Sequence, residues 1–444
     1  MLDSTTKKIL LVFLLIVFGV VAGMKLYTLL KGSLFIDLSL RNNKFQSEDA
    51  LVSEDVKKPD VTVLDCEIAV VGGGAGGTAA AIQSARMGVK TCLIEETNWL
   101  GGMLTSAGVS AVDGHPDNFY GIFREFLNRV EKYYEDKGRL GETSLCHVSP
   151  FCFEPSVGNA IFRQMAAETE NLDVYYNSKI QKVYREGDLV KGVLFTNEYG
   201  KKFSIPTKVT IDATEFGDLM YLADVPYDLG FEENSNEPHV QESEKCIQPL
   251  TYVAILKKYN RDMTIAKPDN YDEKNYVCTV KNPDCPDSPT QFDMVRLLNY
   301  GKMPNGKLMI NTPSHSFGND FHATADELEN YSREGILKMA KDYTLGYIYF
   351  IQTKFGLNQY GLTNEFNTDD YLAKIPYVRE SRRLKGAYRM TEFDVTPDPE
   401  NKGRSKIFSS SIAVGDYPID LHFCTTGLSD VFFSVMPYQI PYET

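Results

Sequence analysis

The chain has 444 residues and a formal net charge of −14, from 46 Lys and Arg against 60 Asp and Glu. Its content of 43% hydrophobic and 24% charged residues is that of ordinary globular proteins and excludes collagen-like and fully disordered chains. The acidic balance argues against nucleic acid as a partner, because phosphate binding requires clustered Lys and Arg. The length is sufficient for two or three domains.

The N-terminus carries an uncharged apolar run over residues 9–24 (ILLVFLLIVFGVVAGM), flanked by Lys7 and Lys25. With the apolar residues that follow, the run approaches the ~20 residues that span a bilayer. It predicts a signal anchor, a transmembrane helix within residues 1–31, with a cleaved signal peptide as the alternative. Residues 41–60 are polar and charged, and a linker is predicted over residues 32–63. We therefore expect a membrane-anchored protein with its folded part outside the cytoplasm, or a secreted one if the segment is cleaved.

The eight cysteines bear on whether the folded part lies in an oxidising compartment or in the cytoplasm. Two closely spaced pairs are predicted to form disulfides in an oxidising compartment: Cys146 with Cys152, and Cys278 with Cys285. The alternative is eight free thiols in a cytoplasmic protein. Cys66 and Cys92 lie in predicted core strands and are expected to be buried free thiols. The sequence has no C-x-x-C, so neither a zinc finger nor a thioredoxin-type redox pair is predicted. No metal-binding residues are predicted.

The strongest motif begins at residues 66–71 (CEIAVV), a short apolar run typical of a buried parallel strand. The glycine-rich run GGGAGG follows, and three of its glycines satisfy G-x-G-x-x-G: Gly72, Gly74 and Gly77. An alanine-rich helix is predicted over residues 78–87, and a second strand over residues 90–94 ends at Glu95. This arrangement within ~30 residues is typical of a dinucleotide-binding βαβ unit.

Each residue of this motif has a physical role. Gly72 permits the tight turn out of the strand, and Gly74 lets a pyrophosphate approach the backbone. Gly77 lets the helix pack closely against the strands. The helix N-terminus offers free N–H groups to the phosphates. Glu95 is placed to bind a ribose hydroxyl.

Flavin and nicotinamide cofactors share this fingerprint. The segment after the acid contains a second glycine pair, Gly101 and Gly102, in Leu100–Thr105 (LGGMLT). An open backbone there favours an extended flavin cofactor, FAD, which lies deep in its protein. A plain turn is the other interpretation of this glycine pair, and a nicotinamide enzyme remains an alternative.

These motifs resemble the FAD-dependent oxidoreductases of the glutathione-reductase-like flavoprotein superfamily, and more narrowly the group sometimes labelled xanthan lyase-related. The resemblance spans roughly residues 64–442 and includes three further segments: residues 246–252, 376–383 and 414–420. It implies that residues 209–218 (VTIDATEFGD) return to the cofactor, with Thr214 and Asp218 beside it. The A-T-G of the superfamily is here Ala213-Thr214-Glu215, which changes the local contacts.

The resemblance also suggests the domain organisation. We expect a Rossmann-like α/β FAD-binding domain over residues 64–218, with an inserted β-meander between residues 173 and 211. Helices are predicted over residues 114–137 and from residue 154 to about 168. A second, α+β substrate domain is expected over residues 219–375, with a long helix over 326–355. Residues 376–444 would return towards the FAD domain, and the chain would stop before the segment that closes over the flavin ring in similar proteins.

Three residues are candidates for contact with the substrate. Arg379 and Arg382 could clamp a carboxylate or a flavin phosphate through the bidentate guanidinium group, although a solvated helix end is the alternative. His422 is the first candidate for an acid–base residue near flavin N5, because histidine titrates near neutrality, although a surface histidine is the commoner case.

The expected function is FAD-dependent oxidation or reduction, with hydride transfer between a small organic substrate and flavin N5. The electron acceptor is not identifiable from the sequence. A membrane-tethered, non-catalytic binding protein on the same scaffold is the alternative from another class. No Ser-His-Asp order, H-E-x-x-H or P-loop is present to support a hydrolase, metalloprotease or nucleotidase.

Overall fold

The computed structural model describes most of the chain after residue 60. The described residues are 61–114, 116–230, 247–279, 293–312, 318–323, 327–328, 332–397, 403–415, 419–420, 432–433 and 438–441. The chain divides into two compact units, Met1–Pro59 and Asp60–Thr444, and every described residue belongs to the second. The predicted membrane anchor therefore lies outside the described residues. Within those ranges, no helix has the length and apolar character that a membrane span requires.

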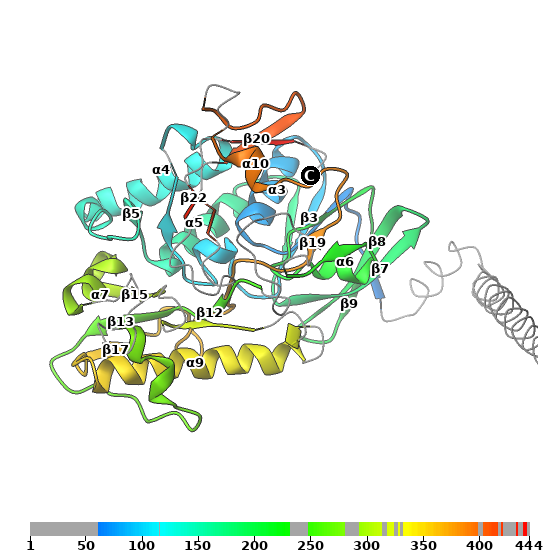
Figure 1. Cartoon of the computed structure of the whole chain (residues 1–444). Coiled ribbons are helices and arrows are strands. Elements are labelled where there is room, and N and C mark those ends of the chain that lie inside the picture. Colours follow the sequence, from blue (N-terminus) through cyan, green and yellow to red (C-terminus); the bar gives the residue numbers. More distant parts are fainter. Residues whose placement is uncertain are drawn as a thin grey trace, which may run out of the picture. The chain divides into compact units, whose positions relative to one another are not determined.

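A four-stranded parallel sheet forms the first part of the fold (Figure 1). Its order is β10-β2-β3-β6, with β2 at Ile68–Val71, β3 at Thr91–Ile94, β6 at Leu172–Tyr175 and β10 at Val209–Asp212. Helix α3 (Ala75–Arg86) crosses from β2 to β3, as the sequence predicts. All four residues of β3 are buried, because parallel strands are covered on both faces. The predicted α/β fold with a parallel sheet is confirmed.

Three helices share one hydrophobic core with this sheet. Helices α4 (Gly121–Asp136) and α5 (Pro155–Ala167) join α3 there, and the rings of Phe126 and Phe162 stack with centroids 3.9 Å apart. The predicted helix over residues 114–137 begins only at Gly121. A separate 3-10 turn, η2 (Pro116–Asn118), precedes α4 and starts at a proline, which cannot donate a backbone hydrogen bond.

An antiparallel meander shares the next core with the parallel sheet. Its strands are β7 (Ser178–Glu186), β8 (Leu189–Asn197) and β9 (Lys202–Pro206), and β1 (Val61–Val63) adds to β9 in parallel. This core joins Val71 and Ile94 of the parallel sheet with Val193, Phe195 and Ile205 of the meander. The parallel sheet is thus buried between helices on one face and the antiparallel meander on the other.

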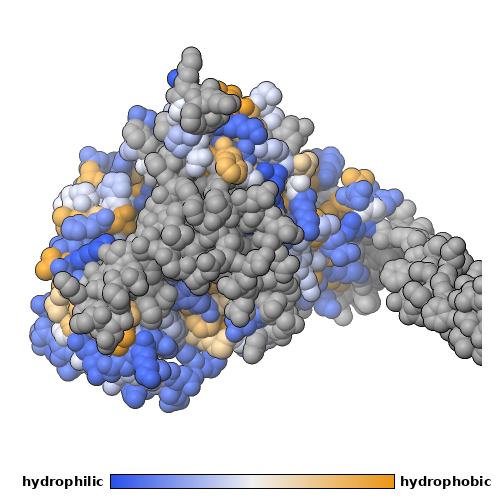
Figure 2. All heavy atoms as spheres, in the orientation of Figure 1, coloured by the Kyte–Doolittle hydropathy of each residue, from blue (hydrophilic) through white to orange (hydrophobic). Residues whose placement is uncertain are grey.

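A second sheet with its own core follows in the chain. Its order is β14-β15-β13-β17, with bounds Lys302–Met303, Lys307–Ile310, Ala254–Lys258 and Tyr360–Leu362. Helices α7 (Met294–Tyr300) and α9 (Arg333–Thr353) supply residues to its core, including the buried Tyr347 and Ile351. Helix α9 starts later than predicted because the Ser332 hydroxyl accepts a hydrogen bond from Gly335 N and caps it. The described surface along α9 is mainly hydrophilic (Figure 2).

The remaining elements are short. The small strands pair as β4 (Ala111–Val112) with β5 (Phe151–Cys152), β11 (Tyr227–Asp228) with β19 (Arg383–Leu384), β20 (Ser411–Gly415) with β23 (Tyr438–Pro441), and β21 (Ile419–Asp420) with β22 (Phe432–Phe433). A three-stranded sheet has the order β16-β12-β18, at Asp320–Phe321, Leu250–Thr251 and Tyr377–Val378. The short helices are α6 (Asp218–Leu222), α10 (Glu392–Val395), η1 (Gly102–Leu104), η3 (Leu140–Glu142), η4 (Glu273–Asn275), η5 (Val277–Thr279) and η6 (Pro304–Gly306).

The cysteines differ in part from the prediction. Cys146 and Cys152 form the predicted disulfide, with Cα atoms 6.0 Å apart. Cys278 is also disulfide-bonded, and its predicted partner, Cys285, lies outside the described residues.

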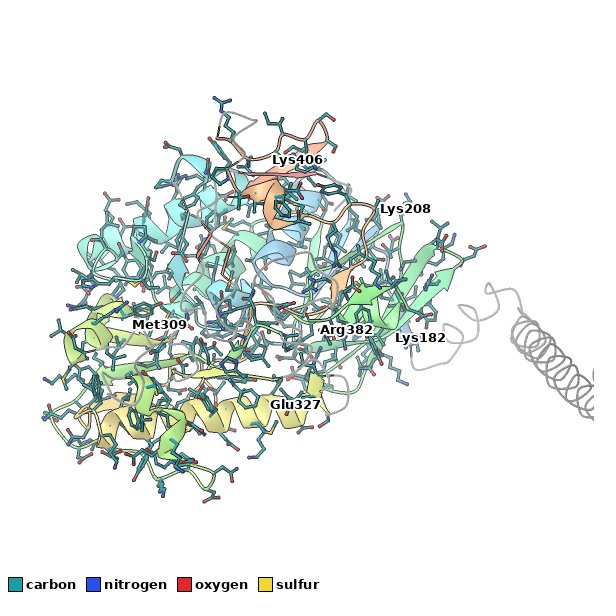
Figure 3. All side chains as sticks on the ribbon, viewed as in Figure 1. Lys182, Lys208, Met309, Glu327, Arg382 and Lys406 are labelled. Atoms are coloured by element: carbon teal, nitrogen blue, oxygen red, sulfur yellow. A yellow bond between two sulfur atoms is a disulfide. The ribbon has the colours of Figure 1, made fainter. Side chains whose placement is uncertain are left out.

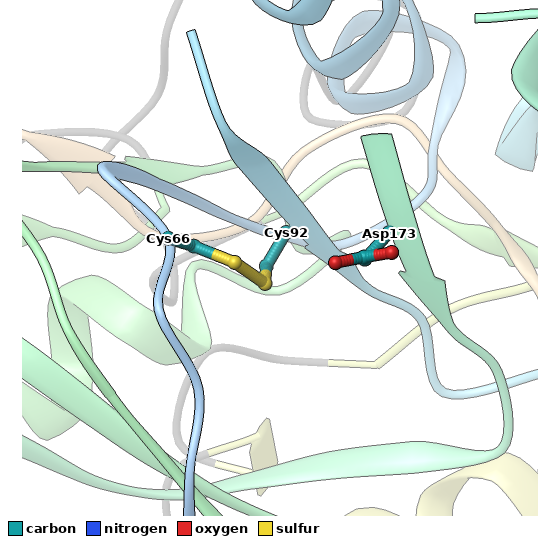
Figure 4. Close-up of side chains that lie close together, drawn as sticks. All are labelled: Cys66, Cys92 and Asp173. Carbon is teal, nitrogen blue, oxygen red and sulfur yellow. A yellow bond between two sulfur atoms is a disulfide. The ribbon is translucent and has the colours of Figure 1, made fainter. Parts of the chain in front are cut away.

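The prediction that Cys66 and Cys92 are free thiols is wrong. They form a disulfide with Cα atoms 5.8 Å apart, because the pairing of β2 with β3 brings the two residues together (Figure 4). Asp173 of β6 lies close to both sulfur atoms, a grouping of the kind that binds metal ions. In the disulfide, however, neither sulfur is the thiolate that a metal requires.

Candidate functional site

The predicted glycine turn lies between β2 and α3. Gly72 has a φ of +99°, and a Cβ there would lie 2.2 Å from the carbonyl oxygen of Ala213. A Cβ at Gly77 would lie 2.0 Å from the carbonyl oxygen of Gly72, so α3 packs directly against the turn. Gly74 differs, since a Cβ there would approach only Glu215 within 3.5 Å. Unlike Gly72 and Gly77, Gly74 therefore has a side that no packed backbone fills.

The second glycine pair packs against this turn. Gly101 N donates to Gly73 O at 2.8 Å, and a Cβ at Gly102 would lie 2.6 Å from the Cα of Gly74. Gly101 has a φ of +103°, and a Cβ there would lie 2.6 Å from the ring of Phe162. The two glycine-rich segments thus form one continuous backbone surface.

A cleft of about 990 Å³ opens beside both turns. Six of the predicted cofactor residues line it: Gly72, Gly74, Glu95, Gly102, Thr214 and Asp218. Residues of β7 and of α9 also line the cleft, at residues 178–181 and 333–341. Gly77 and Gly101 lie behind these residues and act through packing. The cleft is large enough for a cofactor and a small substrate together.

Glu95 follows β3 and is buried at the edge of the cleft. Its Oε2 accepts a hydrogen bond from Gly73 N at 2.7 Å, and its Oε1 accepts from Thr97 N at 2.8 Å and Thr97 Oγ1 at 2.6 Å. Burial raises the pKa of Glu95, and these hydrogen bonds oppose the rise. A carboxylate has about four acceptor sites, so capacity remains for a ribose hydroxyl.

The returning segment forms a turn after β10 that Asp212 organises. Asp212 Oδ1 accepts from Thr214 N at 3.0 Å and from Thr214 Oγ1 at 2.7 Å, and its Oδ2 accepts from Met220 N at 2.8 Å. Thr214 Oγ1 in turn accepts from Asp218 N at 2.7 Å. The turn is therefore held rigidly at the end of β10, next to the glycine loop.

Asp218 forms an ion pair across the cleft. Arg333, the first residue of α9, donates from Nη1 to Asp218 Oδ2 at 2.8 Å and from Nη2 to Asp218 Oδ1. The guanidinium group of Arg333 also lies 4.3 Å from the ring centroid of Phe216. Asp218 therefore joins the returning turn to the long helix of the second sheet.

The structure separates the two predicted arginines. Arg382 lies beside α6 (Figure 3), where its Nη1 donates to Phe216 O at 2.7 Å and its guanidinium group lies 4.5 Å from the ring of Tyr221. It borders a second cavity of about 270 Å³ that adjoins the cleft and shares Asp218 with it.

Arg379 instead joins the strands of the sheet β16-β12-β18. Its Nη1 donates to Thr251 Oγ1 at 2.8 Å and its Nη2 to Asp320 Oδ1 at 3.2 Å, with a side chain 12% exposed. Arg379 is not one of the described residues that line the cleft or the second cavity. The third candidate, His422, lies outside the described residues.

Several residues of the cleft carry no signal in the sequence. Arg333, Lys341 and Lys374 line it as cations, and Tyr252 lines it from the end of β12. The Lys341 ammonium lies 5.0 Å from the ring centroid of Tyr252, and burial lowers the pKa of Lys374. Only the packing of α9 and of the second sheet against the parallel sheet brings these residues to the cofactor loops.

Three features together define a dinucleotide-binding α/β protein: a glycine-rich turn at a helix N-terminus, a buried acid after the next strand, and a rigid returning turn. A family model described as FAD dependent oxidoreductase matches residues 67–444. The chain belongs to this family, and its cofactor is FAD.

The chain also matches several solved structures. One is p-nitrophenol 4-monooxygenase PnpA from Pseudomonas putida DLL-E4, with 13% identity over 74% of this chain and 70% of that chain and a TM-score of 0.34. A second is L-proline dehydrogenase from P. horikoshii, with 18% identity over 35% of this chain and 24% of that chain and a TM-score of 0.22. A third is the flavin-dependent monooxygenase PieE, with 13% identity over 44% of this chain and 35% of that chain and a TM-score of 0.28. The chain spans well under half the length of these last two. Among curated proteins, none matches.

The described residues fit the ADP half of FAD. Gly72 and Gly102 admit no side chain because the surrounding backbone is too close, and together with Gly74 they leave the phosphate loop as bare backbone. The first turn of α3 has no side-chain cap, so its N–H groups are free for an anion.

Proposed function

We propose that the protein transfers a hydride between a small organic substrate and N5 of its FAD. The single observation that carries this proposal is the convergence of three separate segments on one cleft: the glycine turn, Glu95 and the returning turn at Thr214. Their arrangement suits an extended dinucleotide with its reactive ring further along the cleft. FAD supplies the redox chemistry, and the protein supplies orientation, charge and exclusion of water.

The roles of the cofactor residues follow from their positions. Gly72, Gly74 and Gly102 give the pyrophosphate a bare backbone surface, and the α3 N-terminus adds N–H donors. Glu95 accepts from the adenosine ribose with the lone-pair capacity that its internal hydrogen bonds leave. Asp218 orients Arg333 through their bidentate ion pair rather than binding the cofactor with a free carboxylate.

The substrate is proposed to bind between the returning turn and the second sheet. Tyr252, Leu337 and Lys374 line that part of the cleft, and Arg382 borders the adjoining cavity. Arg382 is retained as a substrate-contacting candidate. Arg379 is proposed as a positioning residue, because its guanidinium group already binds Thr251 and Asp320.

We further propose that the folded part is anchored to a membrane and lies outside the cytoplasm. The uncharged run at residues 9–24 supports an anchor, and the disulfides Cys66–Cys92 and Cys146–Cys152 support an oxidising compartment. Oxidised cysteines persist in that compartment, whereas the cytoplasm keeps thiols reduced.

The test is to purify the full chain and measure its bound flavin. We expect a yellow protein that releases FAD on denaturation, and a flavin that is bleached anaerobically by a reducing substrate and recovers its colour with an oxidant. A protein that binds FAD but is reduced by no donor among a panel of small alcohols, amines and hydroxy acids would contradict hydride transfer. A colourless protein that cannot be loaded with FAD would contradict the cofactor site itself.

A further inference from the structure

One acidic side chain lies where the cleft should receive an anion. Glu215 follows the Asp212-Ala213-Thr214 turn, and its side chain is half-buried. A Cβ at Gly102 would lie 2.7 Å from Glu215 Oε1, and a Cβ at Gly74 would lie 3.1 Å from the same atom. The carboxyl group therefore lies between the two glycine segments that form the bare backbone of the phosphate site.

The surroundings of Glu215 do not neutralise it. Its charged neighbour with a marked influence is Glu95, another carboxylate, which follows β3. Four of the other charged groups that line the cleft have ion partners of their own: Lys179 with Glu96, Arg333 with Asp218, Lys338 with Asp342, and Lys341 with Asp370. Two more line the cleft: Glu334 of α9, which adds negative charge, and Lys374, whose ammonium group lies 5.4 Å from the ring centroid of Trp99. Within the described residues, no ion pair is formed by Glu215. Burial and the charge of Glu95 together raise its pKa to about 7.

An ionised Glu215 and the FAD pyrophosphate cannot share this space favourably, because like charges at close range repel strongly in a poorly solvated site. A neutral carboxylic acid behaves differently. Its O–H group donates a hydrogen bond, and a phosphate oxygen is a strong charged acceptor. The same side chain thus opposes the anion in one protonation state and binds it in the other.

We propose that Glu215 binds the FAD pyrophosphate as a neutral carboxylic acid, so that the protein takes up one proton from solvent when it binds FAD. Glu215 is then a cofactor-binding residue whose protonation sets the affinity for FAD. The proposal rests on the cleft being the FAD site and adds a proton to the binding equilibrium. Affinity is high at acidic pH and falls as pH rises through the pKa of the free protein.

The experiment measures FAD binding to the flavin-stripped full chain between pH 6 and pH 9, by flavin fluorescence. For a group that titrates near pH 7, the Kd of the wild type rises about 100-fold over this range, tenfold per pH unit above the pKa. Glu215→Gln keeps the shape without the charge, and its Kd should change less than about threefold, because no group is left to titrate at that position. The control Glu186→Gln, at the exposed end of strand β7, should behave as the wild type.

A calorimetric titration at pH 8 in two buffers of different ionisation enthalpy counts the protons. The wild type should take up about 0.9 proton per FAD and Glu215→Gln about none. If the Gln variant does not fold, Glu215→Gly, which restores the A-T-G pattern, serves in its place. Kd values that are independent of pH in the wild type, or that depend on pH equally in wild type and variant, would overturn the role of Glu215. If no protein binds FAD at any pH, the cleft assignment itself fails.

Discussion

The buried ion cluster around Lys307 allows a prediction of stability. Lys307 Nζ donates to Glu154 Oε1 at 2.5 Å and also to Glu365 Oε2, and it joins α5 to the second sheet. The side chains are 18%, 7% and 2% exposed for Lys307, Glu154 and Glu365. Replacing Lys307 by Met keeps the length of the side chain and removes the cation. Two buried carboxylates are then left without their counter-ion.

The expected loss is ~3–5 kcal/mol of unfolding free energy, the usual effect of removing one partner from a buried ion pair. A surface pair provides the control. Lys90 lies 3.2 Å from Asp65, with side chains 47% and 96% exposed, and Lys90→Met should cost no more than ~1 kcal/mol. The difference between the two variants measures burial, because both substitutions remove one ammonium group.

The assay is urea unfolding followed by circular dichroism and by fluorescence. Trp99 is the single tryptophan of the chain, is buried, and has its ring centroid 5.8 Å from that of Phe366, next to Glu365. Its emission therefore reports on this interface, and coincident transitions from both probes license a two-state free energy.

A rescue variant sharpens the test of this cluster. Lys307→Met combined with Glu154→Gln and Glu365→Gln removes the stranded charges and should recover more than half of the lost stability. A loss below ~1 kcal/mol in the single variant, or a triple variant that is no more stable than it, would refute the reasoning that buried charge causes the loss.

Three further results are expected. Gly74→Asp should abolish FAD retention, because its carboxylate would occupy and repel the pyrophosphate; stoichiometric flavin in the purified variant would contradict this. Thiol counting on denatured, unreduced protein should leave Cys66 and Cys92 unreactive, and peptide mapping should recover them as one cross-linked pair; labelling of both would disprove the disulfide. Although burial acts in the opposite direction, the carboxylates of Glu365 and Glu154 raise the pKa of Lys307. The stability that the charged Lys307 contributes is therefore fully present below the ordinary lysine pKa of ~10.4, and it is lost as pH rises through the raised pKa. As pH rises from neutrality, the stability difference between wild type and Lys307→Met should therefore shrink only in strongly alkaline buffer, and shrinkage near neutrality would contradict the assignment.

Much of the cofactor site could be predicted from the sequence because its determinants are local. The strand, the glycine turn, α3, β3 and Glu95 are contiguous, so periodicity and spacing report them directly. The returning turn was identified by resemblance, since Thr214 lies over 130 residues beyond Gly77 and no local pattern joins them. The family match over residues 67–444 is consistent with that identification.

Other features depended on contacts between distant segments. Cys66 and Cys92 are 26 positions apart with a helix between them, so no local pattern joins them, yet parallel pairing of β2 and β3 places them side by side. Arg379 and Arg382 are three residues apart, yet Arg379 binds Thr251 in a neighbouring strand and Arg382 borders the cavity beside the cleft.

Electrostatic environment was the part that only the tertiary structure could decide. The sequence shows that an acid follows Ala213 and Thr214, but not that the carboxyl group of Glu215 lies between Gly74 and Gly102. Likewise, nothing in the sequence pairs Asp218 with Arg333, which is 115 residues away. A side chain's charge state depends on the dielectric and the charges around it, and those are assembled from every segment that packs there.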